Sequence, residues 1–157
     1  MDENKIYSDI FVSVMGGSMS SRLFQEIREK SGLAYSVYSY NQYYKEGGLI
    51  STYIGTSKES YEKAIEITLN EFKKIREEGI KETELQKSKN KYMSRIAFSM
   101  ENPRSRMTIL GSHYVKKGEI IDIEKLKDEV KSVKLEEIND YIKSHYSLEN
   151  ITVLGNI

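Results

Sequence analysis

Residues 16–40 read GGSMSSRLFQEIREKSGLAYSVYSY, and the hydrophobic period changes inside this stretch. Leu23 and Ile27 have the spacing of one helix face, whereas residues alternate in character after Leu33, as they do along a strand. Gly32 separates the two patterns, at a position where a residue of left-handed conformation often ends a helix. The stretch therefore predicts a short helix, a glycine turn and a strand in direct succession.

The strand that begins at Leu33 predicts a hairpin. Its alternation assigns Leu33, Tyr35 and Val37 to one face, and the other face receives Ala34, Ser36, Tyr38 and Tyr40. A turn at residues 45–48 precedes a second apolar run at residues 49–54, so we expect the two strands to pair antiparallel. A third strand is predicted from the apolar run at residues 151–154.

Amphipathic helices are predicted on both sides of the hairpin. The first ends at Gly16-Gly17, and Ser18 or Ser20 is expected to cap the second. A third follows a capping box at residues 56–59 and ends at Gly79. The later helical patterns contain Leu85 to Met100, Asn102-Pro103 to Gly118, Leu126 with Val130, and Leu135 with Ile138 and Ile142. The predicted fold class is α+β, with an antiparallel or mixed sheet covered by helices.

Three strands make a thin sheet for this number of helices. We therefore expect the complete domain to contain a further strand, upstream of Met1. If that strand is missing, an unpaired sheet edge remains, and such an edge favours self-association through strand pairing.

Length and composition limit the possible functions. The 157 residues fit a single domain, residues 1–157. Basic and acidic residues number 24 each, so no positive field favours nucleic acid as a partner. No apolar run approaches the roughly 20 residues that span a bilayer, and the N-terminus lacks a signal-peptide pattern. A cytoplasmic chain without a membrane partner is expected.

A catalytic metal is not expected in this chain. It has no cysteine and only two histidines, His113 and His145, which are far apart in the sequence. Neither H-x-x-E-H nor H-E-x-x-H occurs. No metal ligand is therefore assigned.

Arg28 and Tyr35 are the candidate catalytic pair. Arg28 lies at the end of the predicted helix and Tyr35 at the start of the strand, with Gly32 between them. Together they could donate hydrogen bonds to a carbonyl oxygen that gains negative charge during nucleophilic attack. The alternative is structural: Tyr35 packs in the sheet, and Arg28 is a cation favoured by the end of the helix dipole.

Two further groups are candidates for binding a substrate. Tyr38 belongs to a tyrosine-rich strand that could receive an extended peptide and grip its side chains, although tyrosine is also common in half-buried strands. Gly16, Gly17 and Ser18 precede a helix and could present backbone N–H groups to an anion, although the chain lacks G-x-x-x-x-G-K-[ST] and no strand immediately precedes the glycines.

Residues 16–39 resemble the signature of the second, non-metal half of the insulinase/pitrilysin family of zinc metallopeptidases, which includes the mitochondrial processing peptidases. The similarity continues through GIKETELQKSKN at residues 79–90 and the Glu101-Asn102-Pro103 segment to the C-terminal run. The resemblance implies two similar α/β halves that close around a peptide substrate. One half carries the zinc and its glutamate base, and the other contributes an arginine and a tyrosine.

By motif position, the resemblance assigns the contacts to the substrate carbonyl to Arg28 and Tyr35. It assigns substrate handling to the turn that contains Gly16, Gly17 and Ser18. It also implies that the chain is a piece of a longer polypeptide or a separately encoded partner, that zinc lies in the other half, and that this half alone does not hydrolyse peptides. The competing class is a structural or interaction domain of the same fold without a catalytic role.

Overall fold

The structure is a computed structural model that describes residues 3–44 and 47–155 of the chain. In chain order its elements are α1 Glu3–Gly16, η1 Phe24–Lys30, β1 Ala34–Tyr43, β2 Gly48–Thr56, α2 Tyr61–Glu78, α3 Glu82–Glu101, α4 Pro103–Lys117, α5 Ile123–Ser132, α6 Leu135–His145 and η2 Leu148–Asn150. Element η1 is a π-helix and η2 is a 3₁₀-helix. The predicted α+β class is confirmed.

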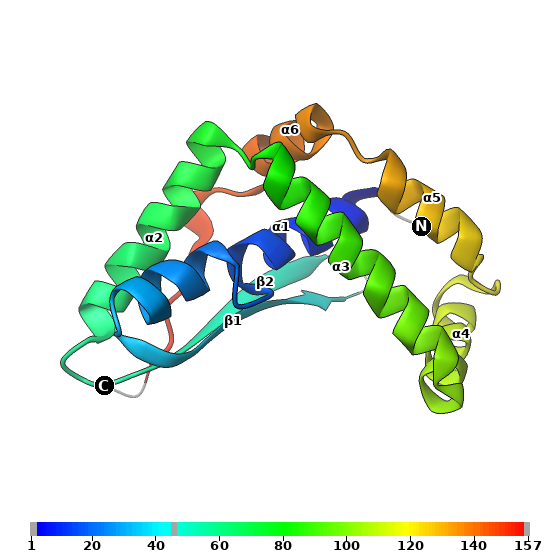
Figure 1. The fold of residues 1–157 in the computed structure, drawn as a ribbon, viewed down its shortest axis with the longest axis horizontal. Coiled ribbons are helices and arrows are strands. Elements are labelled where there is room, and N and C mark those ends of the chain that lie inside the picture. Colours follow the sequence, from blue (N-terminus) through cyan, green and yellow to red (C-terminus); the bar gives the residue numbers. More distant parts are fainter. Residues whose placement is uncertain (1–2, 45–46, 156–157) are drawn as a thin grey trace.

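The described sheet is an antiparallel pair, with Val37 opposite Ile54 and Tyr40 opposite Ser51. Helices α1, α2 and α3 lie on one side of this hairpin (Figure 1). Residues 45–46 of the predicted turn lie outside the described residues, and Tyr44 N–H donates to the Gly47 carbonyl at 2.8 Å beside them. The predicted hairpin is therefore present, with one face covered by helices.

The core is organised around α1. Ile10, Phe11 and Met15 have no exposed surface, since β1, α3 and α6 all pack against this helix. Other fully or almost fully buried side chains come from the η1 region, α2, α3, α5 and α6: Leu23, Ile27, Ile75, Leu85, Val130, Ile138 and Ile142. A helix that is apolar over most of its circumference is stable only when it is enclosed in this way.

A polar cluster centred on Asp9 links α1 to its neighbours. Asp9 Oδ1 accepts from Tyr43 Oη at 2.7 Å and from Asn41 Nδ2 at 2.8 Å, while Oδ2 accepts from Tyr92 Oη at 3.3 Å. Burial raises the pKa values of Tyr43 and Tyr92, and the hydrogen bond to Asp9 and its charge add to the effect. Both phenols therefore stay protonated and donate at neutral pH.

Several predicted helix boundaries are confirmed. Asn102 caps α4 by accepting from Ser105 N–H at 3.1 Å, with Pro103 in the first turn. Helix α2 ends at Gly79 and α4 at Gly118, both with φ of 77°. These glycines occupy a backbone conformation that other residues adopt at a cost.

Two predicted caps are wrong, because the side chains have other partners. Ser18 and Ser20 hydroxyls bond each other at 3.2 Å, and η1 has no side-chain cap. Thr56 belongs to β2, and its hydroxyl donates to the Leu33 carbonyl at 2.6 Å. Helix α2 consequently begins at Tyr61, five residues later than the predicted capping residue, after Ser60 without a side-chain cap bond.

The predicted third strand is also wrong. Residues 151–155 form no strand, and all of them are exposed. Within the described residues β2 pairs with β1 alone, so no neighbouring strand offers this segment hydrogen bonds. An apolar alternating run becomes a strand only where a partner completes the ladder.

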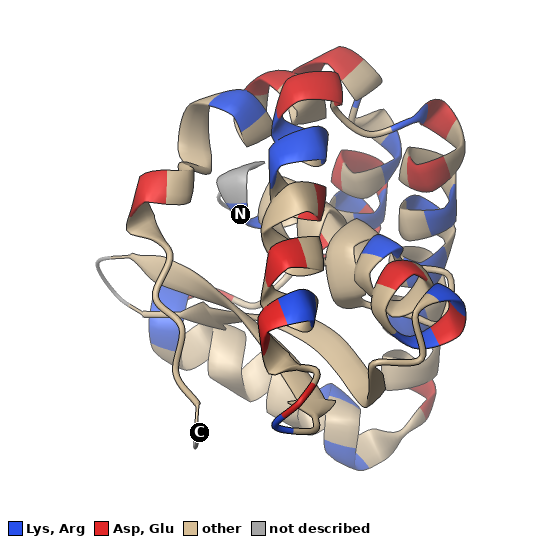
Figure 2. Ribbon diagram, turned by 90° about the vertical axis from the view of Figure 1, so that its left-hand side faces the viewer, with Lys and Arg blue, Asp and Glu red and all other residues tan. Residues whose placement is uncertain are grey.

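Surface charge is mixed. On the face seen in Figure 2, acidic and basic residues are interspersed along the helices rather than gathered by sign. None of the helices in the described part of the chain is long and apolar enough to cross a bilayer.

Candidate functional site

The corner between η1 and β1 carries the candidate catalytic pair. Leu23 and Ile27 have no exposed surface, which anchors η1 in the core. Gly32, with φ of 62°, turns the chain, and Leu33 N–H donates back to the Ile27 carbonyl at 2.9 Å. The helix end and the first residues of the strand are thereby held side by side.

A register shift between Ala34 and Ser36 corrects the predicted strand faces. Ala34 lies opposite Thr56 and Ser36 opposite Gly55, so that Tyr35 is the extra residue. A bulge of this kind turns the following side chains to the other face. As a result Ala34, Val37 and Ser39 are buried under the helices, whereas Tyr35 shares the exposed face with Tyr38 and Tyr40.

Arg28 and Tyr35 are in direct contact. The Arg28 guanidinium carbon lies 4.6 Å from the centre of the Tyr35 ring and 4.9 Å from that of Phe24. Nη1 also donates to the Tyr35 backbone carbonyl at 2.8 Å. The guanidinium is therefore fixed between two rings by a stack and a hydrogen bond, which gives it a defined orientation.

The polar ends of this pair face outward. Tyr35 is 80% exposed, and its hydroxyl has no hydrogen-bond partner among the described residues. Arg28 is half-buried, and its Nε lies 3.8 Å from Glu29 Oε1. The guanidinium keeps further N–H groups that the bond to the Tyr35 carbonyl does not use. The corner thus presents a phenolic O–H and guanidinium N–H groups, which can donate together to one external oxygen.

Tyr38 lies on an aromatic surface beside this corner. Its ring stacks on Tyr53 of β2 at 5.0 Å between centres, and Tyr40 lies 6.1 Å away. The three rings are between 41% and 49% exposed. Half-exposed tyrosines of this kind offer apolar contact area together with hydroxyl groups.

The turn after α1 is held by packing contacts. A Cβ added to Gly16 would lie 2.2 Å from Ser39 Oγ, so the close approach of α1 to β1 requires a glycine here. The Gly17 carbonyl accepts from Lys91 Nζ, and Ser18 is half-buried. The close packing against Ser39 explains why residue 16 is a glycine. Gly17 and Ser18 lie nearer the surface.

The chain offers no described site for zinc. Among residues 3–44 and 47–155, no three His, Asp or Glu side chains come together in a way that could hold a metal ion. His113 Nδ1 lies 2.9 Å from the Glu119 carbonyl, and the His145 ring stacks on Tyr141. The residues present therefore do not fit the metal of a zinc peptidase.

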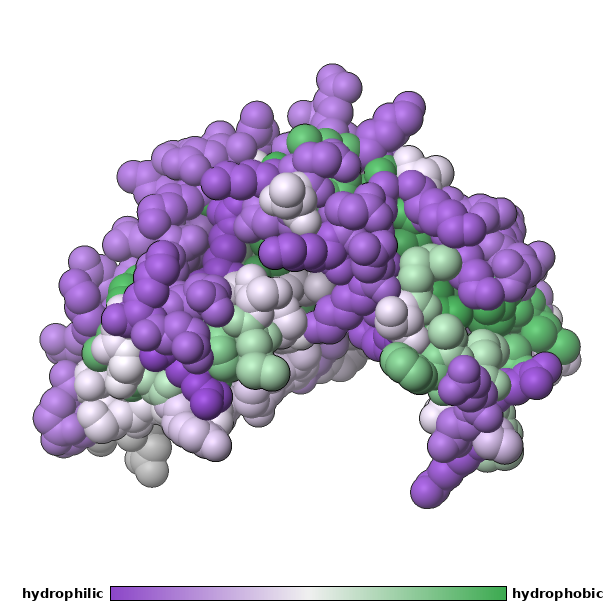
Figure 3. All heavy atoms as spheres, in the orientation of Figure 1, coloured by the Kyte–Doolittle hydropathy of each residue, from purple (hydrophilic) through white to green (hydrophobic). Residues whose placement is uncertain are grey.

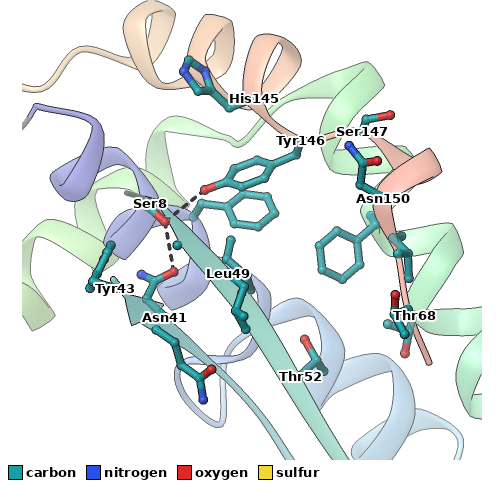
Figure 4. Close-up of a pocket in the computed structure, with 18 of the residues that line it drawn as sticks. Ser8, Asn41, Tyr43, Leu49, Thr52, Thr68, His145, Tyr146, Ser147 and Asn150 are labelled. Carbon is teal, nitrogen blue, oxygen red and sulfur yellow. Dashed lines mark hydrogen bonds between the residues drawn. The ribbon is translucent and has the colours of Figure 1, made fainter. Parts of the chain in front are cut away.

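A second feature, a groove of about 1560 Å³, was not identified among the sequence-based site residues. It lies between β2 and the C-terminal segment, with Leu49 and Thr52 on one side and Asn150 on the other (Figure 4). Tyr146 projects into it and donates to Ser8 Oγ at 3.1 Å. The only sequence signal for this groove is the low number of strands.

Comparison with solved structures shows that the fold of this domain is a known one. The fold matches the solved structure of a peptidase M16 inactive domain from Pseudomonas fluorescens with a TM-score of 0.80, at 20% identity, over 93% of this chain and 35% of that one. It matches an inactive peptidase domain from Bordetella parapertussis with a TM-score of 0.80, at 14% identity, over 95% and 81% of the two chains.

Sequence comparison then gives the family. The family profile described as "Peptidase M16 inactive domain" matches residues 1–92, more than half of the chain. The chain belongs to this family, which confirms the expected resemblance. An uncharacterized zinc protease of Bacillus subtilis, YmxG, is 34% identical over 158 residues, which are 98% of this chain and 39% of that protein. The chain thus spans less than half of that relative.

Proposed function

We propose that this chain is the non-metal half of a zinc metalloendopeptidase. In this proposal another half or subunit supplies the zinc, and the two halves enclose an extended peptide. Arg28 and Tyr35 donate hydrogen bonds to the carbonyl oxygen of the scissile bond as it gains negative charge, and so stabilise the tetrahedral intermediate. Tyr38, on the same exposed face of β1 as Tyr35, lies on the substrate side in this proposal, whereas Gly16 of the turn at residues 16–18 packs against Ser39 on the opposite face.

The observation that carries the proposal is the fixed pair of outward-facing donors. Arg28 is held by the Tyr35 carbonyl and two aromatic rings, while the Tyr35 hydroxyl is left for an external acceptor. Donors that are oriented before the reaction need no reorganisation when charge develops, which is why such groups accelerate acyl transfer. Membership in a family described as an inactive peptidase domain supports a contributing half without the metal.

Tyr35→Phe in the complete peptidase tests the proposal. The substitution removes the hydroxyl and keeps the ring that stacks on Arg28. We expect kcat to fall by about 100- to 1,000-fold, with a smaller change in KM, because the lost hydrogen bond forms mainly in the transition state. Steady-state kinetics on a peptide substrate measures both values.

Tyr40→Phe is the matched control, since Tyr40 is an exposed tyrosine on the same face of β1. Its kcat should stay within about twofold of the unmodified enzyme, as for a surface change outside the reaction. An unchanged kcat in Tyr35→Phe, or equal losses in both variants, would favour a structural or interaction domain instead.

A further inference from the structure

A stacked pair of tyrosine rings lies on the exposed face of the hairpin, beside the candidate catalytic corner. Helices α1, α2 and α3 lie on the other side of the sheet (Figure 1). Tyr38 of β1 is directly opposite Tyr53 of β2, and the planes of the two rings are 24° apart. Both rings are half-exposed, and their hydroxyls have no hydrogen-bond partner among the described residues. An external group can therefore contact both rings at once.

Gly55 determines where the Tyr53 ring lies. A Cβ added to Gly55 would be 3.5 Å from both Cε1 and Oη of Tyr53, and 3.6 Å from Ser36 Cβ on the paired strand. The Tyr53 side chain therefore extends along its own strand and covers Gly55. Because Gly55 pairs with Ser36, and Ser36 directly follows Tyr35, the ring points toward the catalytic corner. A glycine inside a strand often marks a close approach of this kind.

The ring pair lies about two residues from the corner along the sheet. Tyr38 is three positions after Tyr35, but the bulge shortens that path and the Tyr53 ring extends back toward the corner. In an extended peptide, side chains on one face repeat every second residue, at about 7 Å. A peptide whose scissile carbonyl lies at the corner would place the second side chain from that carbonyl over the two rings.

The strands that carry the rings are uncharged. Neither β1 nor β2 contains Asp, Glu, Lys or Arg, although these residue types make up 31% of the chain. Tyrosine rings can attract a cation, but Arg28 at the corner would repel it, and neither strand offers a carboxylate. A charged side chain over the rings would lose its water without gaining an opposite charge on the sheet. The chemistry of this face therefore favours an uncharged side chain.

We propose that Tyr38 and Tyr53 form a subsite for an aromatic side chain of the peptide, two residues from the scissile bond. The inference rests on the proposed function, in which the corner holds the scissile carbonyl, and it adds a preference for one class of substrate residue. A third ring can meet the pair offset or edge to face, and such contacts add binding energy beyond the area that they bury. The stack already restricts both tyrosines, so little further ordering is needed when the peptide binds.

The peptide selectivity of the complete peptidase tests the inference. One series of peptides varies the residue two positions before the scissile bond, and a second series varies the residue two positions after it, each with Phe, Leu, Lys and Glu. We expect kcat/KM for Phe to exceed that for Leu by about 3- to 10-fold, and that for Lys or Glu by at least about 10-fold. The preference should occur in one series only, because the ring pair lies on one side of the corner.

Tyr53→Ala and Tyr114→Ala form a matched pair for this measurement. Tyr114 is an exposed tyrosine of α4, outside the sheet. Tyr53→Ala removes one ring of the pair, so the ratio of kcat/KM for Phe to that for Leu should fall to about one. Tyr114→Ala should keep the ratio of the unmodified enzyme. Comparing two peptides with the same variant removes any effect of the substitution on folding or on the amount of active enzyme.

Gly55→Val tests the position of the Tyr53 ring without removing it. The valine Cβ would already be in contact with the ring, and its methyl groups would extend into the space that the ring occupies. Because valine suits a strand, the hairpin should persist. We expect the Phe-to-Leu ratio to fall by at least about twofold, as the ring moves away from the corner.

Equal kcat/KM values for Phe and Leu in both series would overturn the inference, as would a preference for Lys. A preference for Phe that Tyr53→Ala retains would also contradict it. A dimer of the complete peptidase that Tyr53→Ala dissociates and Tyr114→Ala leaves intact would assign the rings to a second copy of the chain instead.

Tyr35→Phe separates this inference from the proposed function. If Tyr35→Phe lowers kcat as expected and the peptides show no preference for Phe, the subsite alone is wrong. If Tyr35→Phe leaves kcat unchanged, the proposed function fails, and the subsite fails with it.

Discussion

At the scale of single residues, the candidate site depends on how Arg28 is held. A half-exposed arginine normally samples many rotamers, and fixing it costs conformational entropy. Here the two aromatic rings and the Tyr35 carbonyl restrict the guanidinium before any substrate is present. Because the same tyrosine supplies the carbonyl, the ring and the free hydroxyl, a change at Tyr35 that removes the ring would also disorder Arg28. Tyr35→Phe avoids that complication.

Gly16 allows a prediction about packing. Alanine at this position would place its Cβ 2.2 Å from Ser39 Oγ and 2.5 Å from the Ser39 backbone nitrogen, so α1 or β1 must move. We expect Gly16→Ala to lower the free energy of unfolding by about 1–3 kcal/mol, the usual range for overpacking. Chemical denaturation measures the change.

Gly111→Ala is the control for this prediction. Gly111 lies inside α4, and nothing lies within 4 Å of an added Cβ. Alanine should therefore stabilise the helix by up to about 1 kcal/mol. If both substitutions changed the free energy of unfolding in the same direction, the close contact between Gly16 and Ser39 would not explain why residue 16 is a glycine.

At the scale of elements, Arg22 connects three parts of the fold. Its Nε and Nη2 donate to the two Glu84 carboxylate oxygens at 2.7 and 2.8 Å, and Nη2 also donates to the Gly79 carbonyl at 3.0 Å. Glu84 Oε2 in turn accepts from Lys81 N–H at 2.8 Å. The residues before η1, the end of α2 and the first turn of α3 are thereby held together.

Glu84 gives a prediction for acid stability. Burial raises the pKa of the Glu84 carboxyl, but hydrogen bonds from Arg22 and the Lys81 backbone outweigh burial and hold the pKa below its usual value of 4.5. The stabilisation is therefore present above about pH 4.5 and is lost as the pH falls through the lower, folded-state pKa. Glu84→Gln should lower the free energy of unfolding at pH 7 by about 1.5–3 kcal/mol and weaken its dependence on acid pH.

Glu137→Gln is the matched control for the ion pair. Glu137 occupies the same capping position in α6, where Oε2 accepts from Lys134 N–H at 3.0 Å. Its charged partner is the exposed Lys134 Nζ, 3.8 Å from Oε1, instead of a largely buried arginine. Denaturation between pH 3 and 7 should show a smaller loss for this variant, about 1 kcal/mol or less. Equal losses would assign the effect to capping alone.

The elements also show why sequence reasoning failed where it did. Helices, glycine ends and the hairpin follow from local periodicity and backbone preference, and these were predicted correctly. The bulge at Tyr35 was missed because one extra residue in a strand cannot be recognised from an alternating sequence pattern. The strand at residues 151–154 was predicted from its side chains, but a strand also needs a partner, which the described residues do not supply.

The candidate catalytic pair could be predicted from the sequence because, like the helices and the hairpin, it depends on a local pattern. Arg28 and Tyr35 are seven positions apart with a glycine turn between them, so a local pattern brings the pair together. Their roles in catalysis stay a prediction. The groove could not be located, because its sides come from segments about one hundred residues apart in the sequence.

At the scale of the whole molecule, the described residues leave two apolar surfaces uncovered. One is the groove. The other lies at the α4 end of the arch in Figure 3, where hydrophobic side chains gather. No residue of α4 is buried, and Met107 and Val115 are 68% and 84% exposed. Exposed apolar areas of this kind are typical of surfaces that another domain or subunit covers.

The isolated chain of 157 residues should self-associate through the groove, since β2 and residues 151–155 leave their backbone groups unpaired there. Val153→Lys would place an ammonium group in the groove and disfavour an entering strand, so we expect the dimer dissociation constant to rise at least about 10-fold.

Val115→Lys changes the same residue type on the exposed surface of α4 and should leave that constant unchanged. Sedimentation velocity over a range of concentrations measures both. A strictly monomeric chain would contradict the prediction, and a loss of association in Val115→Lys alone would assign self-association to α4.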